Sequence, residues 1–209
     1  MIEYFALLGI FSAMFLLAFL PGYLEYRAPR DPGPLHIDLS RVIEPRSEAM
    51  RFRRTIEALM DSQGWSQKQL WGTLTFEKEF KNDRGSLNVL RIDGNITIPA
   101  GSAVESALIV LGELSSGEHC RFSEMIYVKG RCQIGSHNKL AAITSVGDLS
   151  IGEGSEVLSF ADSDNTVRIM DGCIIGGTVS SDKNVALEGS FDVKRLRGQT
   201  ISMISQSSS

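Results

Sequence analysis

Two histidines, His119 and His137, are the residues whose type and spacing most directly suggest chemistry in this sequence. They lie 18 residues apart, and a histidine at such a site would serve as general base towards a hydroxyl or amine acceptor. Each lies two residues after a glycine, which favours a turn in which the imidazole faces solvent. Since no other reactive side chain groups with them, the sequence predicts no catalytic residues and no enzyme activity.

Other residues with possible chemistry form no recognisable site. Asp162 and Asp164 could touch a cation, but a calcium loop needs several more ligands, so a plain loop is the preferred interpretation. Cys120, Cys132 and Cys173 show no CxxC spacing and are interpreted as reduced thiols. We therefore predict no metal and no cofactor. The GxxxxGK[ST] phosphate loop is also missing from the sequence.

An internal repeat provides the elements that position these residues. Four consecutive units share their pattern: LRIDGNITIPAGSAVESA, LIVLGELSSGEHCRFSEM, IYVKGRCQIGSHNKLAAI and TSVGDLSIGEGSEVLSF. A glycine column contains Gly94, Gly112, Gly130 and Gly147. The next apolar column contains Ile96, Leu114, Cys132 and Leu149. After an insertion at residues 161–167, two further units place Gly172, Gly189, Ile174 and Phe191 in the same two columns.

This repeat predicts a mainly β fold, a single-stranded β-solenoid at residues 84–198. Segments of about six residues with alternating apolar positions form short strands, and glycines with positive φ turn the corners. About three strands close a coil of 17–18 residues, and six coils stack so that their apolar residues form internal ladders.

The N-terminal segment, residues 1–26, is predicted to be a transmembrane anchor. Tyr4–Leu24 has no charged residue, and at 1.5 Å per residue it spans about 31 Å, the thickness of a bilayer core. A cleaved signal peptide is the competing interpretation, but no Lys or Arg precedes the segment and no A-x-A site ends it. Arg27, Arg30 and Arg41 follow it, so we expect a single-pass inner-membrane protein with a cytoplasmic C-terminal domain.

A proline-rich linker at residues 27–45 and a cap region at residues 46–83 follow the anchor. A helix is expected over residues 47–64, with an apolar stripe on one side. Its other side carries Arg46, Arg51, Arg53 and Arg54. A solvated charged face over a capping helix is the preferred interpretation. Contact with anionic lipid is the alternative, and its candidate residues are Arg27, Arg30, Arg51 and Arg54.

The C-terminal end of the solenoid is a candidate polymer interface. The last coil carries the apolar residues Val185, Leu187, Phe191 and Val193. Residues 199–209 are expected to form a polar tail that is too short to cap the exposed strand edge. An uncapped edge would pair with another copy of the chain.

The glycine-punctuated coils VLRIDGNITIPAGSAV, IYVKGRCQIG and TSVGDLSIGEGSEV resemble the bactofilins, bacterial polymer-forming cytoskeletal proteins. The resemblance covers residues 87–193. It implies a right-handed β-helix of triangular section, end-to-end assembly without nucleotide, and a role in cell shape, division or envelope organisation. The long region 27–83 and the insertion 161–167 depart from the family pattern.

The expected function is thus a membrane-anchored scaffold that polymerises with itself and binds client proteins. A net charge of −4 argues against a nucleic-acid partner. The alternative is a membrane-tethered hexapeptide-repeat acyltransferase, because the apolar residues also fit the six-residue lattice of a left-handed β-helix. Coil spacing alone does not decide the handedness.

Overall fold

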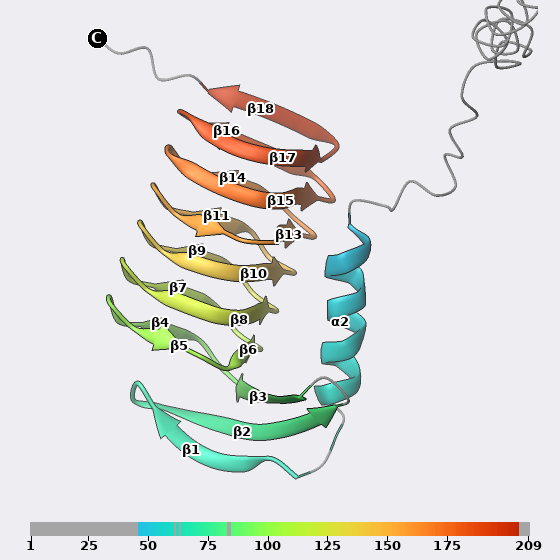
Figure 1. Ribbon diagram of the computed structural model, residues 1–209, viewed down its shortest axis with the longest axis vertical. Coiled ribbons are helices and arrows are strands. Elements are labelled where there is room, and N and C mark those ends of the chain that lie inside the picture. The colour runs from blue at the N-terminus through green and yellow to red at the C-terminus, as the bar shows by residue number, and fades with distance from the viewer. Residues whose placement is uncertain (1–45, 61, 63, 83–84, 205–209) are drawn as a thin grey trace, which may run out of the picture. The chain divides into compact units, whose positions relative to one another are not determined.

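The computed structural model describes residues 46–60, 62, 64–82 and 85–204, which form one helix and a β-solenoid of about six turns (Figure 1). The elements in chain order are α2 (Ser47–Met60), β1 (Ser66–Leu70), β2 (Thr73–Asn82), β3 (Gly85–Ile92), β4 (Ile96–Ile98), β5 (Ala103–Val104), β6 (Ala107–Val110), β7 (Leu114–Ser116), β8 (Arg121–Val128), β9 (Cys132–Ile134), β10 (Lys139–Ser145), β11 (Leu149–Ile151), β12 (Glu156–Val157), β13 (Phe160–Ser163), β14 (Val167–Ile169), β15 (Cys173–Ser181), β16 (Asn184–Glu188), β17 (Phe191–Arg197) and β18 (Thr200–Ile204).

The predicted membrane segment, Tyr4–Leu24, and the linker at residues 27–45 lie outside the residues that the structure describes. Within the described part of the chain, no helix combines the length and the apolar character needed to cross a bilayer.

Each coil has three faces. One face is a seven-stranded sheet in the order β18-β16-β14-β11-β9-β7-β4. The other two belong to an 11-stranded sheet, in which β5 and β6 both pair with the longer strand β8. The register between β8 and β10 shifts between Leu140 and Ala142, where these strands turn the corner between faces. The expected three strand segments per coil are therefore confirmed.

Equivalent residues of neighbouring coils pair in parallel register, as the repeat predicts. Val110 pairs with Val128, and both are fully buried. Leu114 pairs with Ile96 on one side and with Cys132 on the other. These side chains belong to one apolar cluster that runs through the interior of the coils. One coil cannot bury its inner face alone, so the stacking is what stabilises the fold.

The interruption expected at residues 161–167 does not exist. Ala161 of β13 pairs with Ile143 below it and with Val179 above it, so this segment occupies a regular coil position. Asp162, in the same strand, is fully buried. The acidic and polar residues of this segment are typical of an exposed loop. They are buried here because Arg46 and Arg53, which are distant in sequence, pair with Asp162.

The alignment of the last two repeat units was also wrong. The interior column of Leu149 continues through Val167 and Val185. Ile174 and Phe191 lie on another face, where they pair with Glu156 and Cys173 respectively. Gly172 and Gly189 lie at the corner with positive φ and are not equivalent to Gly130 and Gly147, so the predicted alignment of the last two units is shifted.

The glycines at the corners meet two different needs. A Cβ on Gly130 would lie 2.6 Å from the carbonyl oxygen of Gly112, so this column needs glycine for close backbone approach and not for positive φ. Positive φ occurs at a different corner, with values from 56° to 75°, in Gly101, His119, His137, Gly154, Gly172 and Gly189.

The N-terminal end of the stack is covered by a hairpin rather than by the helix. Strands β1 and β2 pair in antiparallel fashion, and β2 pairs in the same fashion with β3 (Figure 1). The turn at Trp71 and Gly72 has positive φ at both residues, as a tight hairpin turn requires. Leu70 and Trp71 pack against the interior cluster. Helix α2 instead lies along the side of the coils.

Candidate functional site

The C-terminal end of the solenoid leaves a complete strand edge open. Strand β18 pairs with β16 on one side only, within the residues that the structure describes. Ile201 is in register with Val185, and Met203 is in register with Leu187, so both continue interior ladders. They are nevertheless 42% and 63% exposed, because no described coil lies above them.

The four residues expected at the polymer interface lie just inside this edge. Val185 and Leu187 are fully buried in the interior cluster. Phe191 and Val193 of β17 are half-buried and pack against the same cluster. Residues 200–204, expected to belong to a polar tail, form β18, which pairs with β16 and so covers Val185 and Leu187. Their role in an interface stays a prediction, and β18 presents the exposed apolar side chains.

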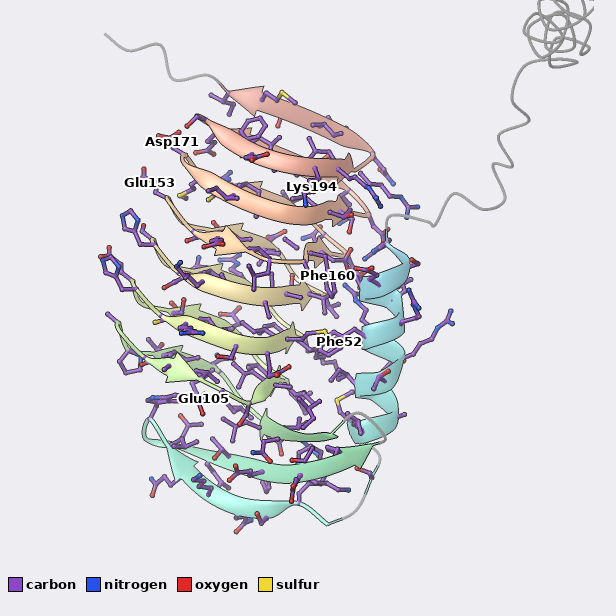
Figure 2. All side chains as sticks on the ribbon, viewed as in Figure 1. Phe52, Glu105, Glu153, Phe160, Asp171 and Lys194 are labelled. Carbon is purple, nitrogen blue, oxygen red and sulfur yellow. The ribbon has the colours of Figure 1, made fainter. Side chains whose placement is uncertain are left out.

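Helix α2 docks on the outer side of the coils through an apolar face. Ala49, Phe52 and Ile56 are buried against a second apolar cluster, which lies outside the solenoid interior. Figure 2 shows Phe52 of the helix facing the coil stack, on the side where Phe160 of β13 lies. The residues that face the helix come from successive coils: Val89, Ala107, Ile109, Tyr127, Ala142 and Phe160.

A buried ionic network centred on Asp162 joins α2 to these coils. Asp162 accepts hydrogen bonds from Arg46 Nε at 2.7 Å and from Arg53 Nη2 at 2.9 Å. Thr144 Oγ1 and Ser180 Oγ, from the coils on either side, donate to the same carboxylate at 3.1 and 2.7 Å. Each charge is therefore paired, as burial of an ionised group requires.

Two further carboxylates complete the network. Arg46 also pairs with Asp164 and Asp182, and Arg53 with Asp164. Burial alone would lower the pKa of the Arg46 guanidinium, but its hydrogen bonds to Asp162 and Asp182 raise that pKa above its ordinary value. Arg46, the residue before α2, is thus held, fully charged, beside the coils that carry Asp162 and Asp182.

The sequence analysis did not predict this network, although the spacing of two of its arginines indicates a shared helix face. Arg46 and Arg53 are seven residues apart and so lie on one face of a helix. The sequence pattern predicts one exposed basic side for Arg46, Arg51, Arg53 and Arg54. Only Arg51 and Arg54 are exposed, while Arg46 and Arg53 are buried. Of the four predicted lipid contacts, Arg27 and Arg30 lie outside the described residues.

The two histidines stack on neighbouring coils. The His119 and His137 ring centroids are 5.2 Å apart with an interplanar angle of 12°, and both side chains are exposed. Both residues have φ of 56° at a corner where the other coils have glycine. Within the described part of the chain, no group of three or more His, Cys, Asp or Glu side chains is placed to hold a metal.

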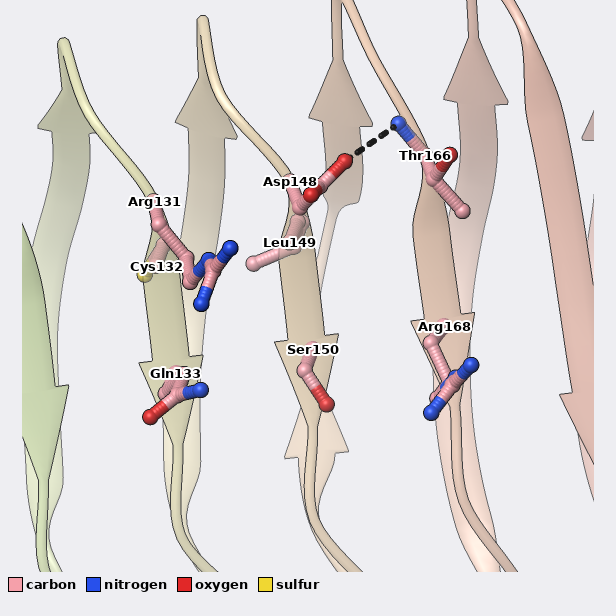
Figure 3. A pocket seen from close by; sticks show the side chains of 8 residues that line it. All are labelled: Arg131, Cys132, Gln133, Asp148, Leu149, Ser150, Thr166 and Arg168. Carbon is pink, nitrogen blue, oxygen red and sulfur yellow. Dashed lines mark hydrogen bonds between the residues drawn. The ribbon is translucent and has the colours of Figure 1, made fainter.

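A shallow polar groove of about 330 Å³ crosses the seven-stranded sheet (Figure 3). Arg131 and Arg168 flank small side chains such as Ser150, and the Thr166 backbone N–H donates to Asp148 Oδ1 at 3.3 Å. Arg168 pairs with Glu188.

Cys132 lies beneath this groove, where burial raises the pKa of its thiol and keeps it protonated. The groove brings together no nucleophile and base.

Comparison with known proteins gives no relative: no family model, no curated protein and no solved structure matches this chain.

Proposed function

We propose that this chain is a membrane-anchored scaffold that assembles with copies of itself, without nucleotide, through the C-terminal end of its β-solenoid. The observation that carries this proposal is the exposure of Ile201 and Met203, which belong to interior ladders but have no described coil above them. A second copy placed on this edge would continue those ladders and pair the open backbone groups of β18.

The finer features of the proposal come from the sequence. They are a right-handed winding, an anchor at Tyr4–Leu24 and a role in cell shape or envelope organisation, as the resemblance to bactofilins implies. Arg46, the residue before α2, pairs with Asp162 and so ties the chain that follows the predicted anchor and linker to the coils. A force on the anchor would therefore reach the solenoid through this ionic network.

The number of chains per particle tests self-assembly. Full-length protein in detergent micelles, without added nucleotide, is expected to contain more than one chain by light scattering. Met203→Arg should reduce this to a single chain, because it places a charge where an apolar contact would form. Leu158→Arg is the matched control, since Leu158 is equally exposed, at 65%, on a side of the solenoid. A wild-type protein with one chain per micelle at all concentrations would overturn the proposal.

A further inference from the structure

The two ends of the solenoid present unlike surfaces. At the C-terminal end, β18 offers an open edge with exposed Ile201, Met203 and Ile204. At the N-terminal end, the outermost strand is β1, whose sequence SQKQL is polar and whose first four residues are exposed. End-to-end assembly therefore has an apolar surface at one end and a polar one at the other.

The N-terminal hairpin seals its end against strand pairing. Leu70 and Trp71 pack against the interior cluster and so cover it at this end. Lys68, in the middle of β1, pairs with Glu77 of β2 at 3.2 Å. A lysine on an edge strand would be stripped of water if another strand paired there, and this is a common protection against edge-to-edge association.

We propose, on the basis of the self-assembly proposed above, that two copies join C-terminal end to C-terminal end about a two-fold axis, and that assembly stops at this dimer. A head-to-tail contact would place the apolar edge of β18 against the polar strand β1. A two-fold contact pairs β18 with β18 of the second copy, like with like, and covers the apolar edge that β18 leaves open among the described residues.

The sequence of β18 suits such antiparallel self-pairing. A register centred on Ser202 brings Ile201 of one chain opposite Met203 of the other, and Ser202 opposite its own copy. The neighbouring strand β17 pairs with β15 on one side only within the described residues, so it too would meet its copy across the two-fold axis.

Disulfide cross-linking distinguishes the possible arrangements. The three native cysteines are all buried, so a single new surface cysteine reports on the contact. Full-length Ser202→Cys in detergent is expected to give a covalent dimer on oxidation. Gln69→Cys, on the exposed edge of β1, should give none alone and no mixed product with Ser202→Cys. Light scattering should show two chains per particle, unchanged in Leu74→Arg of the N-terminal hairpin.

Two kinds of result would contradict the proposed dimer. A mixed Ser202→Cys and Gln69→Cys product, or particles larger than two chains, would refute the closed dimer while leaving self-assembly intact. Particles of one chain, with no cross-link from either variant, would refute both the dimer and the proposed function.

Discussion

Arg46 Nε donates a hydrogen bond of 2.7 Å to Asp162 Oδ1, across 116 positions of the chain. Both side chains are almost fully buried. This contact joins the start of α2 to the middle coils, and it explains why an acidic segment forms a regular strand inside the stack. Asp162 holds Arg53 in the same way, so the helix is held at two points, two turns apart.

Removal of the Asp162 charge should destabilise the fold strongly, because this carboxylate is fully buried. Asp162→Asn leaves two buried guanidinium groups short of a counter-charge, and we expect a loss of about 3–5 kcal/mol in the free energy of unfolding. Urea denaturation measures this loss, and hydrogen exchange should show loss of protection in Ser47–Met60. Glu156→Gln, which breaks the exposed pair with Lys139, is the control and should cost less than about 1 kcal/mol. Equal effects of the two substitutions would contradict the role given to the network.

The left-handed conformation of His137 predicts an unusual order of stability. At a φ of 56° alanine, like histidine, has a steric clash of its Cβ that glycine avoids. His137→Ala should therefore be less stable than His137→Gly by about 1 kcal/mol. Both variants lose the stack on His119, so that contact cancels in the comparison. Thermal unfolding of the two variants measures the difference. Ser136 is outside the left-handed region, so Ser136→Ala should be more stable than Ser136→Gly. If alanine were less stable than glycine at both positions, the explanation would be wrong.

Close packing of neighbouring coils predicts that Gly177 tolerates no side chain. A Cβ there would lie 1.8 Å from the carbonyl oxygen of Ser159, so the backbone must shift. We expect Gly177→Ala to lower the free energy of unfolding by about 1–3 kcal/mol. At Gly94 a Cβ meets nothing within 4 Å, and Gly94→Ala should be close to neutral in the same denaturation experiment. A neutral Gly177→Ala would mean that the coils are spaced more loosely than described.

Asp171 should titrate below the usual range of an aspartate. The backbone N–H of Ser190 donates to its carboxylate at 2.6 Å, the Ser190 hydroxyl donates at 2.9 Å, and these bonds lower the pKa of Asp171. A lowered pKa in the folded state stabilises the fold above the unfolded-state pKa, and this contribution is lost as the pH falls through the folded-state value. Carbon NMR titration should give a low midpoint for Asp171, and Ser190→Ala should raise it. An unchanged midpoint in Ser190→Ala would contradict the assignment of the hydroxyl.

The repeat alone is enough to predict the coil. Alternating apolar residues make short strands with one dry face, and their return every 17 or 18 residues leaves stacking as the way to bury that face. Val110 lies beside Val128, as the repeat predicts. The last coils differ from the prediction, because a glycine needed for close approach and a glycine needed for positive φ look alike in sequence.

The contacts that cover the coils could not be predicted from local pattern, because they join distant segments. Arginine and aspartate are usually solvated, so Arg46 and Asp162 suggested a surface helix and a loop until the fold brought them together and buried both. The same holds for β18, whose five residues are individually unremarkable and become a strand because β16 lies beside them. Local pattern selects the repeating unit, whereas pairing between segments far apart in the chain decides where the stack begins, where it ends and which edge stays open.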